Sequence, residues 1–160
     1  MIVDETTQSV LDPVLEAQAK RWMLGKQTYT APELIRLTGM TRKQVGYWAG
    51  IGLVVPMLKE SGGRRGKPSL FYSASEVVKA LMACELRRRG FSPKQVQQVV
   101  KNLRDESLQL EKPESYLITD GFSVYYAYSE SEVVDVLRHH RQLLLLVPIH
   151  EQVAKLREVA

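Results

Sequence analysis

Cysteine is nearly missing from this sequence: Cys84 is the only one in 160 residues, so no disulfide can form within the chain. Free thiols fit a reducing compartment. Long apolar runs are missing too, because the longest, residues 143–149, is far shorter than the roughly 20 residues of a membrane-spanning helix. The first residues, MIVDETTQ, lack the basic and apolar regions of a signal peptide. We therefore expect a cytoplasmic protein with no membrane partner.

Patterns typical of catalysis or metal binding are also missing. The sequence has no paired nucleophile and base, no phosphate-binding glycine loop and no cluster of metal-ligating residues. His139 and His140 are adjacent, so their side chains on a helix point about 100° apart and make poor joint ligands. We interpret them and His150 as surface histidines. Cys84 is predicted to be a small buried hydrophobe, with a thiol sensor as the less favoured alternative. The sequence thus predicts no enzyme, no cofactor and no metal.

The net charge of +4 hides an uneven distribution of charged residues. Residues 20–104 contain 17 basic and four acidic residues, a net charge of +13, whereas residues 1–19 carry −4 and residues 105–160 carry −5. The overall composition, 44% hydrophobic and 25% charged, is that of a globular protein. A strongly basic segment in such a protein indicates a polyanionic partner, most often nucleic acid. The alternative is a solvated basic surface without a partner.

Signals for helix starts recur along the chain. In a capping box, a Ser or Thr is followed three residues later by Glu or Gln, and each side chain accepts a hydrogen bond from the other residue's backbone N–H. Five such pairs precede apolar residues at helical spacing: Thr30…Glu33, Thr41…Gln44, Ser73…Glu76, Ser92…Gln95 and Ser129…Glu132. They predict five helices, and a further amphipathic stretch at residues 9–24 precedes them.

The first two helices are separated by Gly39 and Met40 only, which predicts a helix-turn-helix. After the second helix, two apolar runs flank a glycine-rich loop within KESGGRRGKPSLFYS, residues 59–73. This pattern predicts a β-hairpin, which in this place is a wing. Arg64, Arg65 and Lys67 supply the charge to follow a phosphate backbone. Taken alone, an ordinary solvated hairpin tip explains the loop equally well.

The pattern changes after residues 109–114, which we interpret as a linker. Asp120-Gly121 between two β-rich runs predicts a hairpin. A capped helix at 130–140, a buried strand at Gln142–Val147 and a last helix at Pro148–Val159 follow. The expected fold class is mainly α: an N-terminal amphipathic extension (1–24), a winged helix-turn-helix domain (25–108), the linker (109–114) and a small ββαβα C-terminal domain (115–160).

Three stretches of the sequence resemble the MerR family of bacterial transcription regulators: YTAPELIRLTGMTRKQVGYWAGIGLVVP, the wing, and LFYSASEVVKALMACELRRRGFSPKQVQQVVKNL. Their shared elements match in order and spacing over about residues 28–104. The tail, YLITDGFSVYYAYSESEVVDVLRHHRQLLLLV, resembles the C-terminal domain of an actinobacterial MerR-like branch that includes cell-division regulators. The resemblance implies a MerR-like winged helix-turn-helix domain in a bacterial DNA-binding regulator.

Three features depart from the family pattern. Gly46 stands where family members usually carry a basic residue, and Leu70 stands where they often have Arg in the wing. Both departures remove phosphate contacts that the resemblance would otherwise imply. The family's long antiparallel dimerisation helix is missing after the fourth helix, where Asp105–Pro113 carries no heptads. A dimer must therefore be built in another way.

The second helix is the expected recognition helix, with Val45 and Trp48 facing the core. The first residues of such a helix reach base edges in the major groove, where Arg and Lys prefer guanine and Gln prefers adenine. The predicted DNA-contacting residues are Thr41, Arg42, Lys43, Gln44, Tyr47, Arg64, Arg65, Lys67 and Tyr72. Thr41 is also the expected N-cap, and Tyr47 resembles the tyrosine with which the family touches phosphate. For Arg87-Arg88-Arg89 we favour an interaction with the helix C-terminal dipole over a phosphate contact.

The predicted function is a sequence-specific, double-stranded DNA-binding transcription regulator, with RNA polymerase as a further candidate partner. Two alternatives stay open: an antitoxin-like or adaptor protein whose acidic tail binds another protein, and an architectural DNA-binding protein. A single winged head recognises only a short site, so we expect a homodimer on a pseudo-palindromic operator. The expected contact is the C-terminal domain, through its strand at 142–147 and its tyrosine-rich hairpin. Residues 9–24 are the alternative contact.

Overall fold

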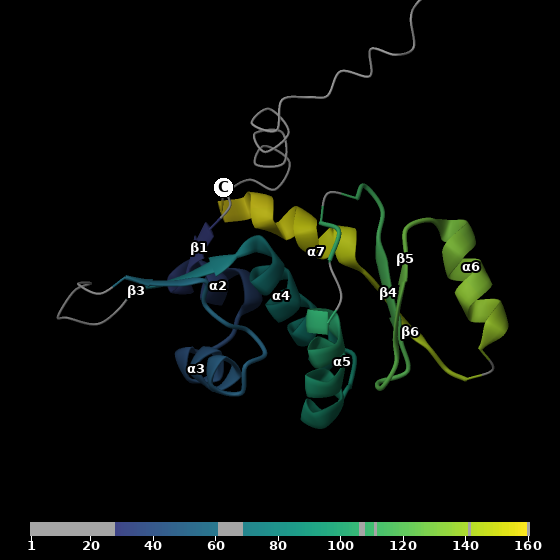
Figure 1. Cartoon of the computed structure of the whole chain (residues 1–160), viewed down its shortest axis with the longest axis horizontal. Helices are drawn as coiled ribbons and strands as arrows, with labels where there is room; N and C mark the ends of the chain where they lie inside the picture. Colours follow the sequence, from purple (N-terminus) through teal and green to yellow (C-terminus); the bar gives the residue numbers. More distant parts are fainter. Residues whose placement is uncertain (1–27, 61–68, 106–107, 111, 141, 160) are drawn as a thin grey trace, which may run out of the picture.

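The structure, a computed structural model, describes residues 28–60, 69–105, 108–110, 112–140 and 142–159 (Figure 1). Its elements are β1 (Thr28–Thr30), α2 (Ala31–Thr38), α3 (Arg42–Gly50), β2 (Leu58–Glu60), β3 (Ser69–Ser73), α4 (Ala74–Arg88), α5 (Pro93–Asp105), β4 (Tyr116–Thr119), β5 (Val124–Ala127), α6 (Glu130–His139), β6 (Leu145–Pro148) and α7 (Ile149–Lys155). The predicted winged helix-turn-helix followed by ββαβα is confirmed. The amphipathic stretch at 9–24 lies outside the described residues.

All five predicted helix starts are confirmed. The side-chain oxygens of Thr30, Thr41, Ser73, Ser92 and Ser129 each accept a hydrogen bond from the backbone N–H three residues later. In two of these capping pairs, the glutamate accepts a hydrogen bond from a backbone N–H other than that of its N-cap residue. Glu76 accepts from the Val55 N–H at 3.0 Å, which ties α4 to the segment after α3. Glu132 accepts from the Tyr128 N–H at 2.7 Å, which ties α6 to the end of β5.

The predicted hairpin after the second helix is present. The N-terminal sheet has the order β1-β3-β2 and is antiparallel, with Tyr29 opposite Tyr72 and Leu58 opposite Phe71. Residues 61–68 join β2 to β3, and they lie outside the described residues together with Arg64, Arg65 and Lys67.

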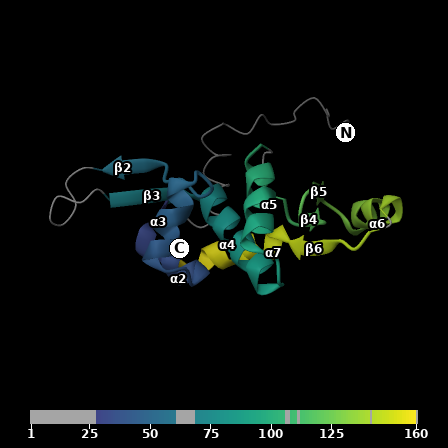
Figure 2. The same cartoon turned by 90° about the horizontal axis from the view of Figure 1, so that it is seen from below.

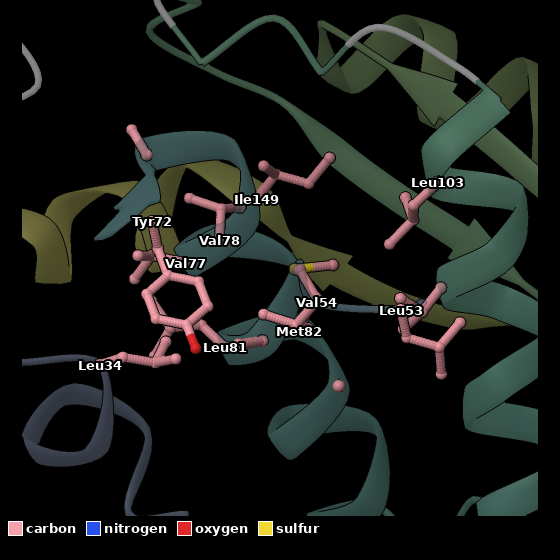
Figure 3. Close-up of a cluster of buried hydrophobic side chains, with 14 of the residues drawn as sticks. Leu34, Leu53, Val54, Tyr72, Val77, Val78, Leu81, Met82, Leu103 and Ile149 are labelled. Atoms are coloured by element: carbon pink, nitrogen blue, oxygen red, sulfur yellow. The ribbon is translucent and has the colours of Figure 1, made fainter. Parts of the chain in front are cut away.

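Helix α4 is the centre of the hydrophobic core, shown in Figure 3. Its residues Val77, Val78, Leu81, Met82 and Leu86 are buried, as their helical spacing predicts. The same cluster takes in buried residues from α2, α3, α5, β4, β6 and α7. Among the described helices, none combines the length and the apolar character that crossing a membrane requires.

The C-terminal sheet has the order β5-β4-β6 and is antiparallel throughout. The predicted hairpin joins β4 to β5 through residues 120–123, and Asp120 accepts backbone hydrogen bonds from Phe122 at 2.8 Å and Ser123 at 2.7 Å. Gly121 has a φ of 97°, and a Cβ there would lie 3.0 Å from Nε2 of Gln95 on α5. Only glycine therefore fits this turn without strain.

The last strand and helix differ in extent from the prediction. Leu143 is 95% exposed, and β6 begins at Leu145, so the expectation of a buried strand from Gln142 is wrong. The reason is that β4 ends at Thr119, which pairs with Leu145, so that residues 142–144 have no partner strand among the described residues. Helix α7 ends at Lys155 and is followed by a 3₁₀ turn, Leu156–Val159.

The C-terminal sheet rests on the helices of the head. Asn102 of α5 donates to the Phe122 carbonyl at 2.7 Å, and Arg89 donates to the Leu146 carbonyl at 3.3 Å. Helix α7 packs on α4, and Leu110, in the expected linker, is buried in the common core. The core is therefore continuous from head to tail, and the predicted division into domains stays a prediction.

Candidate nucleic-acid interface

Helix α3 is held at its start by a complete capping box. The Gln44 N–H donates to Thr41 Oγ1 at 3.1 Å, and the Thr41 N–H donates to Gln44 Oε1 at 2.8 Å. Val45 is buried and Trp48 is half-buried, which fixes the rotation of the helix about its axis. The opposite side of the helix is therefore set to face solvent.

The four predicted contact residues of α3 all lie on this exposed side. Arg42, Lys43 and Gln44 are exposed, and Tyr47 is 55% exposed. The helix carries no acidic residue. Two cations and the NH₂ group of Gln44, which the capping box does not use, thus stand at the positive end of a helix dipole, an arrangement that attracts phosphate and can reach base edges.

Tyr47 is connected to the second pair of helices. Its hydroxyl accepts a hydrogen bond from Nε2 of Gln97 on α5 at 3.1 Å. This bond orients the phenol across the gap between α3 and α5. Gln97 was not among the predicted site residues, because it lies 50 positions from Tyr47 and no local sequence pattern links the two.

Helix α3 and the β2–β3 hairpin lie at the same end of the molecule, and α6 lies at the other end of its long axis (Figures 1 and 2). A recognition helix beside a hairpin is the geometry expected of a winged helix-turn-helix. Arg64, Arg65 and Lys67 belong to the tip of that hairpin, which the described residues do not include.

Residues 29–103 match the family described as MerR helix-turn-helix family regulatory protein. They are a MerR-family helix-turn-helix domain. Three proteins named as uncharacterized HTH-type transcriptional regulators, one from Mycobacterium bovis and two from strains of Mycobacterium tuberculosis, are each 32% identical over 110 residues. The alignment covers 69% of this chain and 48% of each relative, so the chain spans about half the length of the curated relatives it matches.

The structure shows the surroundings of the three features that depart from the MerR pattern. Gly46 is exposed, and a Cβ built on it meets no atom within 4 Å, so the basic residue usual in the family would fit there. Leu70 is half-buried and packs against the core instead of offering a charge. After α5, the described residues contain no long dimerisation helix, and Leu110 turns into the core.

Tyr72 is placed away from the exposed side of the MerR-family domain. Its side chain has no exposed surface and lies among the apolar residues of the α4 core (Figure 3). The hydroxyl has no hydrogen-bond partner among the described residues, and burial raises the pKa of Tyr72. In this conformation the side chain supports the fold and cannot touch DNA, so we do not retain Tyr72 as a contact.

Replacing Tyr72 by phenylalanine tests this placement. The change removes a buried hydroxyl without a partner, so the free energy of unfolding should stay unchanged or rise by up to about 1 kcal/mol. Urea denaturation measures this quantity. DNA affinity should also be unchanged, whereas the matched change Tyr47→Phe should weaken DNA binding. A loss of DNA affinity in Tyr72→Phe, with stability retained, would restore Tyr72 to the interface.

The arginines at the end of α4 are engaged within the protein. Arg88 and Arg89 form ion pairs with Glu85 at 2.6 and 2.8 Å, and Arg87 donates to the Phe91 carbonyl at 2.7 Å. The hydrogen bonds from Arg88, joined by those from Arg89, lower the pKa of Glu85 to about 2. These contacts occupy the three arginines within the protein, whereas their interaction with the helix C-terminal dipole stays a prediction.

The structure also shows the surroundings of the cysteine and of the histidines. Burial raises the pKa of the Cys84 thiol, an effect that Lys155 partly offsets, so the reactive thiolate is disfavoured. His139 is exposed, but His150 is half-buried, bonds to the Ser115 backbone and packs edge-on against Tyr116. The expectation of a surface residue is therefore wrong for His150, because α7 starts directly against β4. It is also wrong for His140, which is half-buried and packs against the Tyr125 ring. No group of three His, Cys, Asp or Glu residues in the described ranges could hold a metal ion.

Two hollows flank α3. One, of about 540 Å³, lies between α2, α3 and β3 and has Arg42 and Gly46 in its lining. The other, of about 430 Å³, lies between α3 and the α4–α5 pair and is lined by residues that include Tyr47, Arg87 and Gln97. The second hollow lies beside α3, in the place where Gln97 donates to the Tyr47 hydroxyl.

Proposed function

We propose that this chain is a sequence-specific, double-stranded DNA-binding transcription regulator. The observation that carries the proposal is the exposed face of α3, where Arg42, Lys43 and Gln44 stand at the positive end of a helix without acids. The MerR-family domain supports the same conclusion. In this function, α3 enters the major groove and the wing follows the phosphate backbone.

Individual residues of the interface have different roles in this proposal. Arg42 and Lys43 read guanine edges, and Tyr47, held by Gln97, contacts a phosphate. Gln44 has a double role, because its carbonyl oxygen already accepts the Thr41 N–H and only its NH₂ group is free to donate to a base. Thr41 acts mainly as the N-cap that positions this face.

We also propose a homodimer on a pseudo-palindromic operator, with the contact made by residues 115–160. The support is the absence of the family's dimerisation helix from the described residues after α5, together with the acidic balance of the tail, which keeps it away from DNA. Chains lacking residues 1–24 or residues 113–160 separate this contact from one made by the N-terminal extension.

Base readout is tested by replacing Arg42 with alanine. Once genome-wide mapping has identified the bound sites, the variant should lose about 1–3 kcal/mol on the preferred sequence and relax the preference at one or two base positions. Binding titrations on a panel of single-base variants of the site measure both effects. Lys112→Ala, the same charge change at an exposed residue of the expected linker, should leave the preference intact.

Two results would contradict this role. If Arg42→Ala weakens specific and non-specific binding by the same factor, Arg42 contacts phosphate and not a base. If the wild-type chain binds all sequences alike, the protein is an architectural DNA binder. Thr41→Ala serves as a folding control, since loss of the N-cap should lower stability by about 1 kcal/mol without DNA.

A further inference from the structure

Helix α6 is the least buried helix of the C-terminal region. None of its residues is fully buried, although apolar residues make up four of its ten positions. Val133 and Val136 are half-buried, and the helix packs on β5. Val134 and Leu137 are more exposed, at 42% and 45%. The helix therefore has a second, partly exposed apolar stripe, formed by Val134 and Leu137.

Charges on this exposed stripe are arranged in a self-complementary way. Glu130, Val134 and Arg138 follow at intervals of four residues, so they lie along one side of α6, with Leu137 beside them. The acid stands in the first turn and the base in the last. Neither Glu130 nor Arg138 forms an ion pair with another residue of the described ranges, and both are exposed.

We propose that this stripe binds the same stripe of a second copy of the chain. In an antiparallel pair of α6 helices with the two-fold axis near Val134, Glu130 of each copy faces Arg138 of the other, and Val134 and Leu137 form the apolar centre. A surface that is complementary to itself under a two-fold rotation is what an isologous dimer requires. The charge order along α6 thus selects a second copy of this chain as the partner.

The position of α6 fits a dimeric DNA-binding protein. Figures 1 and 2 show α6 at the opposite end of the long axis from α3 and the hairpin, so a contact at α6 leaves both heads free. The role of this contact in DNA binding rests on the proposed function. The contact itself does not, because it involves no DNA. It also supplies a substitute for the family's dimerisation helix, which the described residues after α5 do not contain.

The α6 contact is small. A helix of ten residues is about 15 Å long, and stable interfaces bury about 800 Å² on each partner. The free chain is therefore a weak dimer, and DNA with two half-sites strengthens it by raising the local concentration of one copy around the other.

The test is charge reversal in the full chain, measured by analytical ultracentrifugation up to about 1 mM, the effective concentration that a short linkage provides. Glu130→Arg alone and Arg138→Glu alone should each weaken dimerisation about tenfold, because two contacts change from attraction to repulsion. An equimolar mixture of the two single variants should form a heterodimer, since opposite charges then meet at both contacts. The double variant Glu130→Arg/Arg138→Glu should regain most of the wild-type affinity.

Two further variants separate this contact from general effects of charge and apolarity. Asp135→Arg makes the same charge change on another side of α6 and should leave dimerisation unchanged. Val134→Ser/Leu137→Ser should abolish it in a chain that stays folded, because neither side chain belongs to the buried core. The proposal is overturned if the wild type stays monomeric over the whole range, if Glu130→Arg behaves as Asp135→Arg does, or if the mixture fails to associate.

Binding to DNA with one half-site distinguishes this proposal from the proposed function. Every α6 variant should bind one half-site as the wild type does and lose only the added affinity of an inverted repeat. A wild-type chain that dimerises through α6 but binds no DNA would refute the regulator function and leave the α6 contact standing. If the wild-type chain binds DNA and the α6 variants dimerise as it does, the α6 contact is refuted and the regulator function stands.

Discussion

A variant in which Arg64, Arg65 and Lys67 are all replaced by alanine is expected to bind every DNA sequence more weakly by about the same factor. Phosphate contacts carry no sequence information, so their removal lowers specific and non-specific affinity together. Each basic side chain taken away from a phosphate also reduces the number of counterions released on binding. The slope of log K against log salt should therefore fall by about three units if all three residues touch phosphate.

Titrations at several salt concentrations, on the preferred site and on unrelated DNA, measure this slope. Lys112→Ala is the control for loss of a positive charge outside the wing and the recognition helix, and it should change the slope little. An unchanged affinity and slope in the triple variant would show that residues 61–68 are an ordinary solvated hairpin tip. A changed base preference would instead make the wing a reader of sequence.

The second large effect is expected in the core. Met82 has no exposed surface and lies in the middle of α4, the helix on which both the head and α7 pack (Figure 3). Met82→Ala should lower the free energy of unfolding by about 2–5 kcal/mol, because it removes buried apolar contacts and leaves a cavity. The exposed Met57, 51% accessible, supplies the matched control: Met57→Ala should change stability by no more than about 0.5 kcal/mol.

Amide hydrogen exchange measured on Met82→Ala also tests the predicted division into domains. If the continuous core makes head and tail one cooperative unit, Met82→Ala should reduce protection by the same free energy at Val78 in α4 and at Leu117 in β4. Full protection retained at Leu117 would show that residues 115–160 unfold separately, as the boundary at 109–114 predicts.

The sequence predicted the features of the site that depend on neighbouring residues, but not those that depend on contacts between residues far apart in the chain. The side of α3 that faces solvent followed from helical spacing alone, since Val45 and Trp48 define the inner side. Tyr72 was among the predicted DNA contacts, but packing on α4 buries it. The sequence did not predict Gln97 as a site residue, because its hydrogen bond to Tyr47 joins two helices far apart in the chain.

By itself, the sequence determined the local elements of this protein: five helix starts, the turn at Gly39, both hairpins and the order of the two halves. Each depends on residues within a few positions of one another, such as a hydroxyl and the N–H three residues later. Only the tertiary structure decided where β6 begins, that Leu110 and Tyr72 are buried, and that α6 keeps an apolar stripe in solvent. These features depend on which surfaces meet: a strand extends only as far as its partner does, and an apolar side chain is buried only where another element covers it.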